Sequence, residues 1–142
     1  MEYTPQFSVV WNNLGFFFQG VLLTLQIVLT AIAFGLVLGI AGAMGRTSKN
    51  RYANWIATAY VEFFRNTPFL IQLFFFYFGL PSIGVRMTPW QAAVLALAIN
   101  FGAYATEIIR AGIEGIEKGQ IEAGMSLGFK KFQIFRHIIL MP

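Results

Sequence analysis

The chain has 142 residues, of which 57% are hydrophobic and only 11% are charged, whereas an ordinary soluble domain carries about 25% charged residues. So few polar groups cannot cover so many apolar side chains in water, and the composition predicts a membrane protein in contact with lipid. The net charge of +4 is spread between apolar runs, where basic residues govern topology, so we expect no nucleic-acid partner. The absence of cysteine excludes disulfides, thiolate catalysis and thiolate metal sites.

The first apolar run predicts a transmembrane helix. No charged residue occurs from 3 to 45, and the run from 16 to 43 exceeds the roughly 20 residues that a bilayer requires. Its second half places four small residues at intervals of four on one helical face: Ala31, Gly35, Gly39 and Ala43. Such a groove lets another helix approach closely, either in ordinary helix packing or as a specific dimer seam.

The second span lies in the stretch YVEFFRNTPFLIQLFFFYFGLP, residues 60–81. Thr67 with Pro68 can start a helix, because proline suits a first helical turn. From Pro68 to Leu80, however, the helix would rise only about 20 Å, against a hydrocarbon core of about 30 Å. We therefore expect the span to reach back through Ala57 and to contain a helix break at Pro68.

This extension places Glu62 and Arg65 at or inside the membrane boundary, three residues apart on one helical face. Charges within a membrane usually face a bundle interior or an aqueous pathway, so both residues are candidates for a translocation pathway. The alternative is that both side chains extend to the cytoplasmic headgroups.

A third span is predicted over about Trp90–Ile109, with Thr88 and Pro89 as the helix start and Trp90 as an interfacial anchor. Three polar residues fall at i, i+4 and i+7 on one face of this helix: Asn100, Tyr104 and Glu107. This stripe either lines a pathway or bonds a neighbouring helix. Arg110 follows Glu107 by three residues, and we expect it to pair with Glu107 or to mark the membrane exit.

The basic residues predict the orientation of the spans. They follow the first span (Arg46, Lys49, Arg51) and the third (Arg110, Lys118, Lys130, Lys131, Arg136), with only Arg86 between the second and third. Because basic loops stay in the cytoplasm, we expect the N-terminus outside and the segment 113–142 inside. No internal repeat or linker divides the chain, so residues 1–142 are expected to form one all-α domain.

The cytoplasmic segment predicts two short helices. The first spans about Ile121–Leu127 and is closed by Gly128 in a left-handed conformation. The second, FKKFQIFRHIIL, places Phe132, Phe135, Ile138 and Ile139 on one side and Lys130, Gln133, Arg136 and His137 mostly on the other. Two interpretations remain open: a helix lying on the membrane surface, or a helix-turn-helix that docks on another protein.

Three ordered motifs resemble the permease subunits of ATP-binding-cassette importers for polar amino acids. The first is Glu122, Ala123, Gly124, then Gly128 and the run from Ile138 to Pro142, which is similar to the EAA motif of these permeases. FFRNTPFLIQLFFFYFGLP is similar to their FRGTP-type second span, and NFGAYATEIIRAGIEGIEKGQ to the approach to their EAA loop. Gly124 stands in place of the second Ala, Asn66 in place of the usual Gly, and Met141 separates the final Leu and Pro.

The resemblance implies a multi-pass protein of the bacterial inner membrane that moves amino acids and has no catalytic residue, metal or cofactor of its own. It implies four partners besides lipid: an ATPase subunit, an extracytoplasmic substrate-binding protein, a second permease subunit in a homo- or heterodimer, and the amino acid. ATPase coupling falls to Glu122, Ala123, Gly124 and Gly128. Members of this family generally have about five spans, so the resemblance implies a fragment or a reduced permease.

A zwitterionic substrate requires a cation for its carboxylate and an acceptor for its ammonium. The candidate pathway residues are therefore Glu62, Arg65, Asn100, Tyr104 and Glu107. No Walker A pattern or Ser-His-Asp set is present, so ATP hydrolysis is expected on another chain. A different kind of function stays open, a small oligomeric membrane channel or scaffold assembled around the polar stripe.

Overall fold

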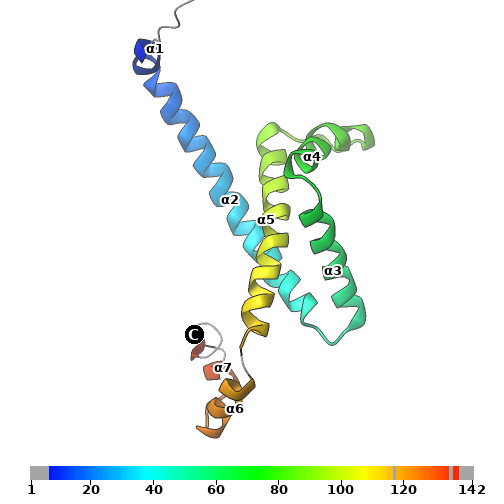
Figure 1. Cartoon of the computed structure of the whole chain (residues 1–142). Coiled ribbons are helices and arrows are strands. Elements are labelled where there is room, and N and C mark those ends of the chain that lie inside the picture. Colours follow the sequence, from blue (N-terminus) through cyan, green and yellow to red (C-terminus); the bar gives the residue numbers. More distant parts are fainter. Residues whose placement is uncertain (1–6, 117, 135, 138–142) are drawn as a thin grey trace, which may run out of the picture.

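The computed structural model describes residues 7–116, 118–134 and 136–137, and no β-strand occurs within these ranges. The elements are α1 (Phe7–Asn12), α2 (Leu14–Arg46), α3 (Arg51–Asn66), α4 (Phe69–Phe74), the π-helical η1 (Phe75–Gly79), the 3₁₀-helical η2 (Leu80–Ile83), α5 (Pro89–Glu114), α6 (Lys118–Ser126) and α7 (Lys131–Ile134). The predicted all-α fold is therefore confirmed for the described residues. Figure 1 shows α2, α3 and α5 packed together, with α6 and α7 beyond the end of α5.

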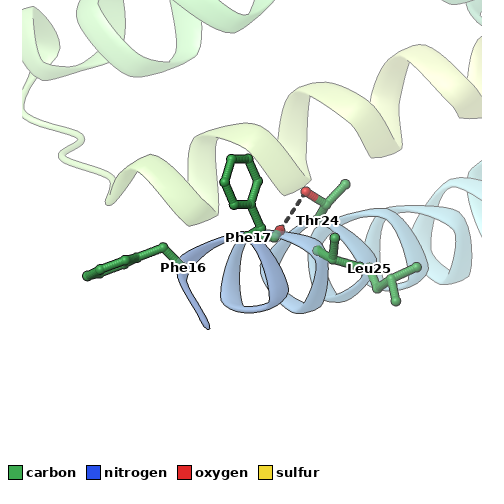
Figure 2. A pocket seen from close by; sticks show the side chains of 6 residues that line it. Phe16, Phe17, Thr24 and Leu25 are labelled. Carbon is green, nitrogen blue, oxygen red and sulfur yellow. Dashed lines mark hydrogen bonds between the residues drawn. The ribbon is translucent and has the colours of Figure 1, made fainter. Parts of the chain in front are cut away.

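Two of the described helices, α2 and α5, are long and apolar enough to cross a membrane. With 33 residues, α2 is about 50 Å long at 1.5 Å per residue. Its first half extends away from the other helices (Figure 1). An apolar groove of about 530 Å³ lies on this half, and Figure 2 shows its lining side chains. The Thr24 hydroxyl there donates to the Gly20 carbonyl at 2.8 Å. Large apolar side chains such as Phe16 and Leu29 are exposed on this half, as expected of a surface that meets lipid or another helix.

The second half of α2 packs along α5 through the small-residue groove that the sequence predicts. The buried residues of α2 are Ala31, Gly35, Gly39 and Ala43. The fully buried Thr106 hydroxyl of α5 lies 3.3 Å from the Gly39 carbonyl oxygen and 2.8 Å from the Gly102 carbonyl oxygen, close enough to donate to either. Within this chain the groove therefore serves close helix packing.

Helix α3 is joined to both neighbours by hydrogen bonds. The Asn50 side chain caps its first turn by accepting from the Tyr52 and Ala53 amides at 2.9 and 3.4 Å. The Asn54 amide group donates to the Arg46 carbonyl at the end of α2. The Tyr60 hydroxyl donates to the Ile99 carbonyl of α5 at 2.7 Å. Helix α3 runs antiparallel to α5 (Figure 1).

The predicted second span is interrupted. Helix α3 ends at Asn66, Thr67 has the extended angles φ −105° and ψ 130°, and α4 begins at Phe69. The apolar stretch Phe69–Ile83 is shorter than the two membrane-length helices, and α4 turns away from the direction of α3 (Figure 1). The number of spans and their orientation therefore stay predictions.

Helix α5 begins where the sequence predicts. Thr88 and Gln91 form a capping box, in which the Gln91 amide donates to the Thr88 hydroxyl and the Thr88 amide donates to the Gln91 side chain. Pro89 occupies the first turn. The helix runs past the predicted end of the span at Ile109 to Glu114, and Arg110 bonds to Glu107 and Glu114 across its last turns.

The predicted Ile121–Leu127 helix is α6, which begins earlier, at Lys118, and ends at Ser126. Gly128 has φ +79°, and the amides of Gly128 and Phe129 donate to the carbonyls of Met125 and Gly124 at 2.9 and 3.0 Å. The left-handed closure is thus present. In α7 the predicted apolar residue Phe132 is 70% exposed. Phe135 and the run from Ile138 to Pro142 lie outside the described residues.

Candidate functional site

Four charged residues from three helices meet near the end of α5, and we call them the Glu107 cluster: Arg46, Arg65, Glu107 and Arg110. Arg46 is the last residue of α2, and its Nη2 atom lies 3.3 Å from Glu107 Oε1. Arg65, near the end of α3, places Nη1 3.7 Å from Glu107 Oε2. Arg110 binds the same carboxylate through Nε at 3.1 Å and Nη2 at 2.9 Å.

The cluster is partly shielded from solvent and carries net positive charge. The Glu107 and Arg46 side chains are only 17% and 16% exposed, whereas Arg65 is 39% exposed. Arg110 also pairs with Glu114, so three guanidinium groups face two carboxylates. The group therefore has an excess of one positive charge, and Arg65 is the most exposed of its three arginines. Such an arrangement is costly to desolvate unless the ions stay paired.

Arg65 has a second partner in the polar stripe of α5. Its guanidinium carbon lies 5.3 Å from the centroid of the Tyr104 ring, a cation–π geometry. Tyr104 is itself 45% exposed. Arg65 and Tyr104 therefore form an accessible polar patch with a cation and an aromatic hydroxyl, beside the largely shielded carboxylate of Glu107.

The other two candidate pathway residues are placed differently. Glu62 is exposed, and its carboxylate accepts from the Asn66 side chain at 3.0 Å. Asn100 contacts the junction of α3 and α4, where its amide group donates to the Phe64 carbonyl at 3.4 Å and to Gln72 Oε1 at 3.2 Å. Of the five predicted residues, the structure thus brings three together.

Three residues of this region, Arg46, Arg110 and Gln72, are not among the predicted site residues. In the sequence Arg46 indicates topology alone, whereas Arg110 is expected to pair with Glu107 or to mark the membrane exit, and it does pair with Glu107. Gln72 is the only polar residue in the apolar run from 69 to 76, and it is 4% exposed. A lone amide in such a run is the signal that could have identified it, because a buried amide requires partners.

The predicted ATPase-coupling residues lie in and after α6. The Glu122 side chain is exposed, while its carbonyl accepts from the Ser126 hydroxyl at 2.9 Å. Gly124 is buried, and Gly128 makes the left-handed turn after the helix. The segment therefore presents a carboxylate on a short helix that lies beyond the end of α5 (Figure 1).

Neither of the two cavities described here reaches the Glu107 cluster. The groove of Figure 2 lies on the first half of α2. A second cavity of about 610 Å³ lies between α2, α5 and residues 85–87, with Phe34, Trp90 and Leu95 in its lining. Within the part of the chain that the structure describes, no group of three or more His, Cys, Asp or Glu side chains could hold a metal ion.

In the described residues, a helical fold with two apolar helices of membrane length fits the class of membrane proteins. The chain belongs to the family described as binding-protein-dependent transport system inner membrane component, which matches residues 31–140. This finding confirms the resemblance to transporter permeases that the motifs predict.

Individual relatives agree with this family. The chain is 44% identical over 133 residues to the probable glutamine ABC transporter permease protein GlnM of Bacillus subtilis. It is 37% identical over 135 residues to the glutamine transport system permease protein GlnP of Escherichia coli K12. Each match covers 94% of this chain and 62% of the relative.

The fold is shared with a crystal structure of an amino acid ABC transporter with histidines, with a TM-score of 0.85 and 36% sequence identity. The match covers 95% of this chain and 63% of that one. The chain therefore spans less than two thirds of the length of the relatives named here, and its fold is that of the corresponding part of a transporter permease.

Proposed function

We propose that this chain acts within the permease subunit of an ATP-binding-cassette importer that moves an amino acid across the bacterial inner membrane. The family match and relatives named as glutamine permeases support this function. The observation that carries the proposal for the substrate is the accessible Arg65 over Tyr104, with the Glu107 carboxylate 3.7 Å away. A zwitterionic amino acid presents the complementary pair of charges.

In this proposal Arg65 binds the carboxylate of the substrate and Glu107 binds its ammonium group. Tyr104 contacts the side chain of the substrate. Two further residues belong to the same proposed pathway. Glu62 lies at its exposed edge, and Asn100 lies at the junction of α3 and α4. A second permease subunit completes the pathway, and a binding protein outside the membrane delivers the substrate.

ATP hydrolysis takes place on a separate ATPase subunit, to which α6 is coupled. Glu122 provides the charged contact with a basic residue of that subunit, on the helix that also contains Ala123 and Gly124. Gly128 provides the turn that ends α6, since glycine adopts φ +79° at less cost than other residues. Closure of two ATPase subunits would push α6 and switch access to the pathway.

The permease that contains this chain can be tested in vesicles with its ATPase and binding protein. We expect amino-acid uptake that requires ATP, and we expect Glu122→Gln to lower the amount of ATPase that copurifies. Gln120→Lys is the matched control, because it changes the charge of α6 by the same +1 at an exposed neighbouring position. Substrate flux that needs neither ATP nor the ATPase would instead support an oligomeric channel.

A further inference from the structure

The break between α3 and α4 leaves a helical carbonyl without its normal donor. In an α-helix the Phe64 carbonyl accepts from the amide of residue 68. Residue 68 is proline, which has no N–H, and the chain becomes extended at Thr67. In the interior of a membrane protein no bulk water is available to satisfy this oxygen, so another donor is required.

Two side-chain amides supply the missing donors. Gln72 Nε2 of α4 donates to the Phe64 carbonyl at 2.8 Å and to the Thr67 carbonyl at 2.9 Å. Asn100 Nδ2 of α5 donates to the Phe64 carbonyl at 3.4 Å and to Gln72 Oε1 at 3.2 Å. We call these four hydrogen bonds the amide clamp.

The amide clamp has no spare N–H donor, because each of the two amide nitrogens has two acceptors for its two hydrogens. The orientation of the Gln72 amide is fixed by its partners: both acceptors are backbone carbonyl oxygens, and the reversed amide would place its own oxygen against them. Gln72 is 4% exposed, so the loss of its nitrogen would leave two carbonyls in the protein interior without this donor.

The clamp joins α3, which carries Arg65, to α5, which carries Tyr104 and Glu107. Arg65 directly follows Phe64 on α3, and Tyr104 lies one helical turn after Asn100 on α5. We infer that Gln72 and Asn100 are positioning residues, which hold the broken end of α3 against α5 so that Arg65 stays over Tyr104 and beside Glu107. Their role in transport rests on the proposed function.

The inference gives Asn100 a role that differs from direct contact with the substrate. Both of its N–H groups are already bound to protein oxygens, so a substrate carboxylate could gain them only by breaking the clamp. The Arg65 side chain, in contrast, is 39% exposed and can donate hydrogen bonds to a further partner.

The first test measures maximal uptake per assembled transporter in the full complex. Gln72→Leu keeps the approximate volume and removes the donors, and we expect it to lower this rate about fivefold through misplacement of Arg65. Gln19→Leu, the same change at an exposed position of α2, should leave the rate unchanged. In an Arg65→Lys background, which lacks the planar guanidinium, Gln72→Leu should cause little further loss.

A clamp that served stability alone would give other results. Gln72→Leu would then reduce the yield and the melting temperature but not the rate per assembled complex, or it would lower the rate equally in both backgrounds. Either result would overturn the inference. A wild-type complex without ATP-dependent uptake would refute the proposed function but not the geometry of the clamp.

A second measurement tests the geometry without transport. The melting temperatures of Gln72→Leu, Arg65→Gln and the double variant in detergent form a double-mutant cycle. We expect the double variant to lose clearly less than the sum of the two single losses, because Arg65 can contribute its contacts only while the clamp positions it. Additive losses would show that the clamp and Arg65 act independently.

Discussion

At the scale of single residues, the position of Glu107 determines how three arginines can coexist between helices. Its carboxylate lies within 3.7 Å of Arg46, Arg65 and Arg110. Glu107→Gln removes the negative charge and keeps the shape, so the guanidinium groups lose their common partner and repel one another. We expect the variant to lose about 1–2 kcal/mol of unfolding free energy, a value reduced by the partial exposure of the cluster. Chemical denaturation in detergent would measure this loss.

Glu62→Gln is the control for this variant. Glu62 is exposed, and its bond from Asn66 can persist with an amide oxygen as the acceptor. Its effect should stay within about 0.5 kcal/mol, as for most surface substitutions. Equal effects of the two variants would mean that the Glu107 cluster contributes no special stability.

The sequence predicts some residues of the candidate site and not others, for a physical reason. Helical periodicity identifies Tyr104 and Glu107 as neighbours, because they share a face of one helix. The placement of Arg65 beside them depends on how α3 crosses α5, and helical periodicity does not predict that crossing. Arg46 joins from a third helix, and the order of residues along the chain gives no sign of that contact.

At the scale of helices, Gly35 sets the distance between α2 and α5. A Cβ atom at this position would lie 2.8 Å from the Ala98 carbonyl oxygen and 2.7 Å from a Phe101 ring carbon. Because one of these neighbours is backbone, the two helices would have to move apart. We expect Gly35→Ala to cost about 1–3 kcal/mol of unfolding free energy, as overpacking usually does.

Gly20→Ala provides a matched control on the same helix. A Cβ atom there would meet nothing within 4 Å, and alanine favours helix over glycine by up to about 1 kcal/mol. The Gly20 variant should therefore be neutral or slightly more stable in the same denaturation experiment. If Gly35→Ala behaved like Gly20→Ala, the groove would not govern the packing of α2 on α5.

Local signals predict helix starts and the small-residue groove well, since the responsible residues are close in sequence. Thr88, Pro89 and Gln91 define a start without help from the rest of the fold. Pro68 likewise predicts the helix break that lies between Asn66 and Phe69. The residues that bond the carbonyl left by this break are harder to predict, because Asn100, one of its two donors, lies 32 residues beyond Pro68 along the chain.

At the scale of the whole molecule, the orientation in the membrane rests on the unequal distribution of basic residues. Arg46, Lys49 and Arg51 flank the connection between α2 and α3, whereas Arg86 is the only basic residue between η2 and α5. Because basic connections remain in the cytoplasm, the two connections should lie on opposite sides of the membrane. The structure places them at opposite ends of α3 and α5 (Figure 1), which this topology requires.

The chain contains no cysteine, so single introduced cysteines can report the orientation. Lys49→Cys places a thiol at an exposed position of the first connection, and Ser82→Cys places one at an exposed position of η2, two residues before the second connection. In intact cells we expect a membrane-impermeant maleimide to label Cys at 82 but not at 49, and to label both after permeabilisation. The cysteine-free protein controls for background. Labelling of position 49 alone in intact cells would reverse the topology, and it would place α6 on the side of the membrane where no ATPase could reach Glu122.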